Sequence, residues 1–282
     1  MKTYLDCYPC FLRQALSAAR RAGAPEDQQR LILLNTMEEL QALPADATPP
    51  QMAYRIHQQI RQQTNTIDPY RQAKDNATQQ ALALYPQLKA MVSKAIDPLE
   101  TALRIAIAGN IIDLGVAESY DLEATLDRVL IQPFAINDMS SLRTSLAESR
   151  AILYLADNAG ETVFDRVLME TLDHSITYVV KGGPIINDAI CEDAVAAGID
   201  QVAEIIDNGS DAVGTLLDDC SESFRKRFEL AELIIAKGQA NYESLSGSSA
   251  PLFFLLQAKC SVIAQDLGVS EGAVVLKQQA LK

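Results

Sequence analysis

Two adjacent oxygen-bearing side chains, Asp157 and Asn158, stand directly after a short apolar run in the segment Ala151-Ile-Leu-Tyr-Leu-Ala-Asp-Asn-Ala-Gly-Glu161. A pattern typical of an amphipathic helix follows over 161–173. Buried parallel strands read as near-continuous apolar runs, whereas amphipathic helices repeat about every 3.6 residues. We therefore expect both side chains at the carboxyl end of a parallel strand, the edge where open α/β sheets bind ligands.

Polar residues follow three further predicted strands in the same way. The segments are Lys181-Gly-Gly-Pro-Ile-Ile-Asn-Asp188, Asp207-Asn-Gly-Ser-Asp211 and Lys237-Gly-Gln-Ala-Asn-Tyr-Glu243. A single loop of this kind is more often an ordinary turn, because turns favour Asn, Asp and Gly. Four such loops in succession favour a ligand site over four unrelated turns.

The residue types at these strand ends suit a hard divalent cation, because they offer carboxylate and amide oxygens. Asp157 and Asp188 would supply negative charge, and Asn158 would supply a neutral oxygen. Magnesium typically combines one or two protein carboxylates with substrate phosphate oxygens. With only two histidines in the chain, a histidine-rich zinc site is close to excluded.

A phosphate group would find further partners at the same edge. Backbone N–H groups near Gly160 and Gly183 can approach an anion, as can helix N-termini. Lys237 would add a point charge for phosphate. Glu161 would either carry a proton or cap its helix. These parts predict metal-assisted phosphoryl transfer to water, with a water molecule or one of the two aspartates as the attacking group.

The elements that must position these residues alternate between strands and helices. The predicted strands are 151–156, 176–181, 202–206, 232–236, 251–256 and 273–276. The predicted helices are 161–173, 188–197, 211–230 (either continuous or broken), 239–246 and 259–266. Such alternation implies a parallel sheet with right-handed crossovers. We expect an α/β fold with a Rossmann-like, three-layer domain and a mainly parallel sheet over 97–282.

Residues 1–96 show only helical periodicity, which predicts a helical N-terminal domain. A further helix over 101–115 is apolar almost all round and should be buried. It nevertheless contains Asn110 and Asp113. Buried polar groups cost a few kcal/mol unless they are paired, so these two residues either cap the helix end or face a solvated site.

Four motifs in this order resemble those of the metal-dependent damage-control phosphatases, the ARMT-like family once called domain of unknown function eighty-nine. They are Gly-Asn-x-x-Asp at 109–113, Asp-Asn-Ala-Gly-Glu at 157–161, Lys-Gly-Gly-Pro-Ile-Ile-Asn-Asp at 181–188 and Lys-Gly-x-x-Asn-Tyr-Glu at 237–243. The resemblance covers essentially the whole chain, including Cys7-x-x-Cys10 and Asp68-Pro-Tyr70, and is greatest to the stand-alone prokaryotic branch.

The resemblance implies a helical N-terminal region on a Rossmann-like domain that hydrolyses phosphate esters of sugars or damaged metabolites. It implies cobalt, nickel, manganese or magnesium as the cofactor. Asp157, Asn158 and Asp188 match the residues that hold the metal in the family. The substrate site would be lined by Asn110, Asp113, Lys237 and Asn241. Gln239 is a departure, because other branches carry an acid at this position.

Composition narrows the possible partners. The chain has 282 residues, of which 48% are hydrophobic, and 37 acids against 24 basic residues give a net charge of −13. Nucleic-acid surfaces need a basic stripe, so we expect none here. No apolar run approaches the ~20 residues of a membrane span, and no signal peptide is recognisable. We expect a cytoplasmic protein that acts on a small-molecule phosphate ester, and a homo-oligomer is compatible with the sequence.

Two other functions remain open. An S-adenosylmethionine-dependent carboxyl methyltransferase would usually place a glycine-rich loop where Asp157 and Asn158 stand. A non-catalytic binding protein could use the same metal without turnover. The cysteines Cys7 and Cys10 are open between packing, redox and zinc roles, although two thiolates do not complete a structural zinc site. Cys260 could join them only if the two ends of the chain meet.

Overall fold

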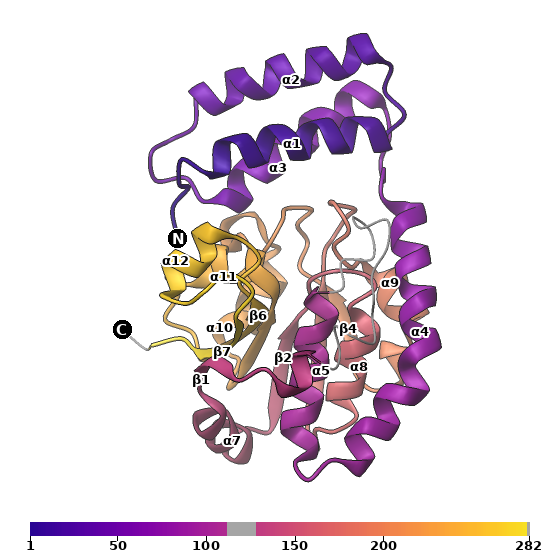
Figure 1. Cartoon of the computed structure of the whole chain (residues 1–282), viewed down its shortest axis with the longest axis vertical. Coiled ribbons are helices and arrows are strands. Elements are labelled where there is room, and N and C mark those ends of the chain that lie inside the picture. The colour runs from indigo at the N-terminus through magenta and orange to yellow at the C-terminus, as the bar shows by residue number, and fades with distance from the viewer. Residues whose placement is uncertain (112–127, 281–282) are drawn as a thin grey trace.

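The computed structural model describes residues 1–111 and 128–280; Asp113 therefore lies outside the described residues. Its first three helices are α1 (Cys7–Arg21), α2 (Glu26–Gln41) and α3 (Pro49–Thr64). They pack together through one apolar cluster. Helix α3 begins at a capping box formed by Thr48 and Gln51, and prolines occupy its first turn, where the missing N–H is harmless. Figure 1 shows this three-helix layer above one edge of the sheet.

The next two helices leave that layer and run along the side of the sheet. They are α4 (Arg71–Lys94), which continues through Pro86, and α5 (Pro98–Ile111). Helix α4 packs against α5 and α8. No described helix is long and apolar enough to cross a membrane.

The sheet has seven strands in the order β1-β7-β6-β5-β2-β3-β4. The bounds are β1 (Phe134–Asn137), β2 (Ala151–Leu155), β3 (Ser175–Val180), β4 (Glu204–Asp207), β5 (Ile234–Lys237), β6 (Leu252–Gln257) and β7 (Val274–Gln278). Five neighbouring strands are parallel, whereas β7 pairs antiparallel to β6 and parallel to β1. The carboxyl ends of β2 to β6 therefore share the edge that faces the three-helix layer.

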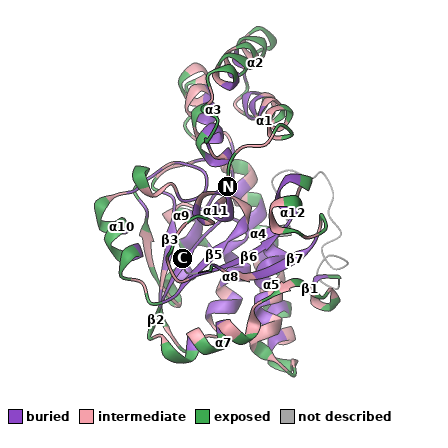
Figure 2. Ribbon diagram, turned by 90° about the vertical axis from the view of Figure 1, so that its left-hand side faces the viewer, coloured by how far each residue is buried: buried purple, intermediate pink, exposed green. Residues whose placement is uncertain are grey.

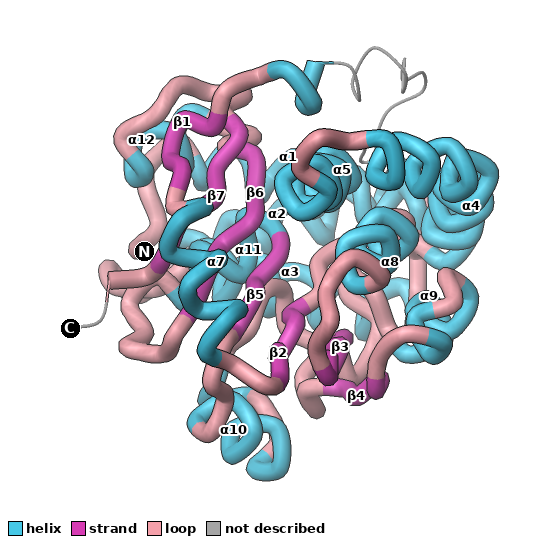
Figure 3. The backbone as a smooth tube through the Cα atoms, turned by 90° about the horizontal axis from the view of Figure 1, so that it is seen from below, coloured by secondary structure: helices cyan, strands magenta, loops and turns pink. Residues whose placement is uncertain are grey.

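Helices cover both faces of the sheet (Figures 2 and 3). One face packs against α4, α5, α7 (Met139–Glu148), α8 (Thr162–Met169) and α9 (Cys191–Ala196). The other packs against α10 (Glu222–Glu229), α11 (Gly238–Leu245) and α12 (Ser261–Leu267). Short 3₁₀ helices lie at Ile199–Gln201 and Leu217–Asp219. Successive strand residues alternate between the two faces, so Tyr154 faces the α5–α8 side and Leu155 the other.

The expected α/β class with a mainly parallel sheet is confirmed. All six predicted strands are present, with bounds that differ by up to a few residues. Strand β1 and helix α7 were missed. Strand β1 is a four-residue edge strand whose residues alternate between half-buried and exposed, and its apolar run Phe134-Ala-Ile136 is too short to indicate a strand. The helix predicted over 211–230 is wrong for most of its length, because only Glu222–Glu229 is α-helical. The domain boundary at residue 96 stays a prediction.

Candidate active site

Two loops bring the predicted metal ligands together at the sheet edge. Asn158 and Asp188 form an isolated antiparallel bridge. The Ala189 N–H donates to the backbone carbonyl of Asp157 over 2.8 Å, and the Ala159 N–H donates to the carbonyl of Asn187 over 2.8 Å. Backbone hydrogen bonds thus fix the loop after β2 against the loop after β3.

The amide groups of Asn110 and Asn158 orient the neighbouring carboxylates. Asn110 Nδ2 donates to Asp157 Oδ2 over 2.7 Å and to Glu161 Oε2 over 3.1 Å. Asn158 Nδ2 donates to the same two oxygens over 3.1 and 3.2 Å. Because Asn158 uses its amide nitrogen here, its carbonyl oxygen is left to accept or ligate elsewhere.

Lys237 contacts the carboxylates from the protein interior and is fully buried. Its Nζ donates to Glu161 Oε1 and Asp165 Oδ1, each over 2.5 Å, and to the Ala106 carbonyl over 2.9 Å. Burial works to lower the pKa of Lys237, but the charges of Asp165 and Glu161 outweigh it and raise that pKa. Its three ammonium donors are engaged, so Lys237 supports Glu161 and does not reach the cavity.

Strand alternation explains this position of Lys237. In β5, Ile235 faces the α5–α8 side and Ala236 faces the opposite side. Lys237 is therefore turned toward α5 and α8, where Ala106 and Glu161 lie.

Asp165 completes the buried network on the same face. The hydroxyl of Tyr154 donates to Asp165 Oδ1 and that of Tyr178 donates to Asp165 Oδ2, each over 2.8 Å. The two rings stack with their centroids 5.5 Å apart. The sequence reasoning missed Asp165, although an acid four residues after Glu161 on the apolar face of the helix was an available signal.

Lys181, the first residue after β3, holds the second aspartate. Its Nζ lies 3.5 Å from Asp188 Oδ2 and donates to the Gly214 carbonyl. Lys181 is itself buried. Like Lys237, Lys181 is a positively charged residue at the end of a strand. The sequence analysis did not assign a role to it.

The carboxylates at this edge have too few positively charged partners, and the pKa values of Asp157 and Asp188 are raised. Burial raises the pKa of Asp157 well above its ordinary value, and the charges of Glu161 and Asp188 raise it further. Burial also raises the pKa of Asp188 to about 6, although Lys181 opposes the shift. The four buried carboxylates Asp157, Glu161, Asp165 and Asp188 have two buried lysine partners, Lys181 and Lys237, and the exposed Lys259 offsets the charge of Asp157 only in part.

The donor set fits a divalent cation. Asp188 Oδ2 and Asn110 Oδ1 are buried and lack a hydrogen-bond partner among the described residues. No three carboxylate, thiol or imidazole side chains of the described residues converge as a cation site. The fit therefore depends on two carboxylates together with the amide oxygen of Asn158, and hard cations accept such mixed oxygen ligands.

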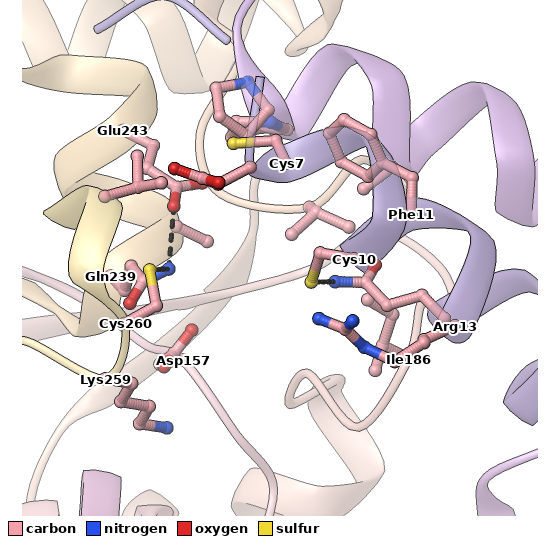
Figure 4. Close-up of a pocket in the computed structure, with 18 of the residues that line it drawn as sticks. Cys7, Cys10, Phe11, Arg13, Asp157, Ile186, Gln239, Glu243, Lys259 and Cys260 are labelled. Carbon is pink, nitrogen blue, oxygen red and sulfur yellow. Dashed lines mark hydrogen bonds between the residues drawn. The ribbon is translucent and has the colours of Figure 1, made fainter. Parts of the chain in front are cut away.

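These groups open into a cavity of about 610 Å³ between the three-helix layer and the strand ends. Asp157, Asn158 and Asp188 line one side of it. Helix α1 contributes Arg13, and the loop between β6 and α12 contributes Lys259. Figure 4 shows Asp157 with Lys259 to one side and Arg13 reaching in from α1. The sequence reasoning missed both cations; Lys259 follows a predicted strand, which was an available signal.

Three other predicted substrate contacts lie outside the cavity lining. Gly160 is buried against α4, and a Cβ there would lie 2.8 Å from Ala77 Cβ. Asn241 donates to the carbonyls of Ala156 and Lys237 over 3.0 and 2.8 Å, which ties α11 to the strand ends. Gly183 lies next to Asp211.

Three cysteines also line the cavity: Cys7 and Cys10 from α1, and Cys260 from the residue that precedes α12. The two ends of the chain thus do meet here. Burial raises the pKa of the Cys7 thiol, which disfavours the thiolate needed for nucleophilic or metal-binding chemistry. All five cysteines are free thiols.

The fold and site define a class of α/β proteins with a cavity at a carboxylate-rich strand edge. The chain belongs to the damage-control phosphatase ARMT1-like domain family, whose domain matches residues 3–275. The resemblance seen in the motifs is confirmed. The expected phosphatase activity is confirmed at the level of this family, and the methyltransferase alternative is not favoured.

Several relatives are similar over most of their length. A damage-control phosphatase of Archaeoglobus fulgidus is 40% identical over 235 residues, covering 80% of this chain and 81% of that one. An uncharacterized protein of Methanocaldococcus jannaschii, MJ0202, is 37% identical over 284 residues, covering 96% and 93%. The crystal structure of a DUF89 family protein from Pyrococcus horikoshii superposes with a TM-score of 0.90 at 31% identity, covering 99% and 100% of the two chains.

Proposed function

We propose that this chain is a divalent-metal-dependent phosphatase that hydrolyses phosphate monoesters of small metabolites. The observation that carries the proposal is the pair of buried aspartates, Asp157 and Asp188, at one side of a ligand-sized cavity. Both have raised pKa values caused first by burial, and a divalent cation would offset the negative charge that the neighbouring lysines leave.

Asp157, Asn158 and Asp188 would hold manganese, cobalt, nickel or magnesium. When bound, such a metal polarises a phosphoryl oxygen and favours a water nucleophile. The hydrogen bonds from Asn110 and Asn158 fix Asp157 Oδ2. These residues keep the ligand oxygens in place before substrate arrives, which is the usual source of electrostatic catalysis.

Glu161 supports the site and is not assigned to proton transfer. Its Oε1 accepts from Lys237, and its Oε2 accepts from Asn110 and Asn158. Both oxygens are therefore engaged in a fully enclosed position. We assign the same supporting role to Lys237 in place of a direct phosphate contact.

Lys259, and not Lys237, would contact the substrate phosphate. It is exposed and lines the cavity, and its charge acts on Asp157 to lower the pKa of that carboxyl against the effect of burial. A lysine ammonium this close to the aspartate is suited to neutralise phosphate oxygens bound there.

The substrate would be a small phosphate ester, and the cytoplasm is the proposed compartment. Five free thiols are typical of proteins kept in a reducing compartment.

The test is phosphate release from a panel of sugar phosphates and nucleotides with each of the four metals. We expect activity that requires metal, and we expect Asp157→Asn to lower kcat by at least about 100-fold, since loss of a metal ligand removes several kcal/mol of transition-state stabilisation. Asp200→Asn, at an exposed position, is the matched control and should retain wild-type activity.

Two results would contradict the proposal. One is near-normal activity of Asp157→Asn with metal in excess. The other is metal-dependent ligand binding with no phosphate release from any ester, which would favour a non-catalytic binding protein.

A further inference from the structure

A second positively charged side chain, Arg13, lines the cavity, and the proposed phosphatase chemistry does not use it. Arg13 lies on α1 and lines the cavity from the three-helix layer, whereas Lys259 comes from the loop before α12. In Figure 4 the Arg13 side chain reaches inward beside Cys10 and Ile186, away from Lys259. The side chains of Arg13 and Lys259 therefore line different walls of one cavity.

Arg13 is not engaged by the protein's own acids. Seven arginines of the described chain form ion pairs with carboxylates: Arg55, Arg61, Arg71, Arg104, Arg143, Arg166 and Arg227. Arg13 forms no such pair among the described residues, although Asp6 and Glu243 line the same cavity. An available guanidinium has a planar fork that matches carboxylate and phosphate oxygens bidentately.

The two acids of the wall do not cancel this charge. Glu243 is only 8% exposed, and its Oε1 accepts from Gln239 Nε2 over 2.8 Å. Burial raises the pKa of Glu243 to about 7, so it is not firmly ionised at neutral pH. Asp6 is the N-cap residue of α1, seven residues before Arg13, and within the described part of the chain the two form no ion pair.

The cavity is large enough for an ester that spans both cations. Its volume of about 610 Å³ lies in the range of small-molecule sites, roughly 300–1,000 Å³. A phosphate held beside Asp157, Asp188 and Lys259 occupies only one end. Figure 4 shows Arg13 across the cavity from Asp157 and Lys259, so the body of an ester bound there would extend toward α1.

We propose that the substrate is a phosphate ester with a second anionic group, a carboxylate or another phosphate, and that Arg13 binds this second group. The inference rests on the proposed function, because it takes the scissile phosphate to lie at the aspartates. It makes Arg13 a specificity-determining residue supplied by the three-helix layer.

The experiment compares three esters in the presence of manganese. Glucose 6-phosphate has no second anion, 6-phosphogluconate has a carboxylate, and fructose 1,6-bisphosphate has a second phosphate. We expect wild-type kcat/KM to be higher for at least one of the two doubly anionic esters than for glucose 6-phosphate, and the preferred ester identifies the second group. Arg13→Ala should lower kcat/KM for the preferred ester by about 10- to 100-fold, mainly through KM, because a bidentate charged contact is lost. Activity on glucose 6-phosphate should stay within about twofold, since that ester has no group for Arg13 to bind.

Two variants serve as controls. Arg13→Lys keeps the charge but loses the planar fork, so its KM should be intermediate. Arg20→Ala removes an exposed arginine from the same helix whose Nε donates to Gln29, and it should leave all three esters unaffected.

The assignment is overturned if Arg13→Ala affects all three esters equally or none of them, or if wild type shows no preference for a second anion. Failure of the proposed function is separable, because no ester would be hydrolysed at all. In that case calorimetry with 6-phosphogluconate and fructose 1,6-bisphosphate still decides: equal affinities of wild type and Arg13→Ala for both compounds overturn the role of Arg13.

Discussion

At the scale of single residues, Gly238 shows how tightly Asp157, one of the proposed metal ligands, is enclosed. It follows Lys237 at the start of α11 and adopts φ of +79°, in the left-handed region that favours glycine. A Cβ at this position would lie 1.9 Å from Asp157 Oδ2. The glycine in the Lys-Gly motif is thus required by the carboxylate beside it as well as by its own backbone.

Gly238→Ala should therefore abolish most metal-dependent activity. Its methyl group must displace Asp157, in addition to the backbone strain of about 1–2 kcal/mol. Gly268→Ala is the matched control, because Gly268 has φ of +69° and a Cβ added there would meet nothing within 4 Å. Steady-state kinetics and thermal melts on both variants separate the two effects. Equal activity losses in both would show that strain alone is responsible.

The sequence was sufficient to identify the residues of the candidate site, but it did not show how deeply each side chain is buried. Asp157, Asn158 and Asp188 stand after apolar strand-like runs, and the shared strand edge brings them together. Lys237 has the same sequence context, yet it is buried, because strand register turns it under α5. The sequence does not state which face of the sheet a terminal strand residue takes.

At the scale of elements, a buried ion network fixes the start of α4 against α9. Lys74 Nζ lies 3.1 Å from Asp68 Oδ2 and 3.0 Å from Asp193 Oδ2, and the side chains of Lys74 and Asp193 are completely buried. Arg71 also pairs with Asp193, over 2.5 Å. This network holds the point where the chain passes from the three-helix layer to the side of the sheet.

Lys74→Met should lower the free energy of unfolding by about 3–5 kcal/mol, because it removes the fully buried charge that pairs with Asp193 and Asp68 and leaves only Arg71 among the described residues to pair with Asp193. Lys89→Met on the same helix is the control. Lys89 pairs with Glu170 but its side chain is 51% exposed, so the change should be below about 1 kcal/mol. Urea denaturation measures both. A similar small loss in the two variants would contradict a stabilising role for the buried network.

The loop that carries Asp188 has a feature that its sequence does not predict. Ile186 adopts φ of +43°, which is unfavourable for a β-branched residue. Its side chain packs against the apolar clusters of the three-helix layer and of α3 with Val213. Tertiary packing therefore imposes this conformation. Local patterns identified most strands because apolar runs are local, whereas such a loop depends on contacts with distant helices.

At the scale of the whole molecule, the buried carboxylates of the site belong to a chain that carries a net charge of −13. A divalent cation that binds only the folded state stabilises it, and the stabilisation grows with the logarithm of the free cation concentration once this exceeds the dissociation constant. Stability and metal content should therefore be linked.

Manganese added to chelator-treated protein should raise the melting temperature. At 100 times its dissociation constant the ligand contributes about 2.7 kcal/mol, or roughly 5 °C for a chain of this size. Asp188→Asn should lose most of the shift, because one charged ligand is removed. Differential scanning calorimetry with and without metal provides the measurement. An unchanged shift in Asp188→Asn would place the binding site elsewhere.

The reversed direction of β7 has a practical consequence. Because β7 runs antiparallel to β6, the chain leaves the sheet at the edge opposite the cavity. A biotin or affinity handle attached beyond β7 would hold the molecule on a sensor chip with the cavity turned to the flowing solution. Binding of metal and esters can then be recorded on the immobilised protein without the attachment blocking entry.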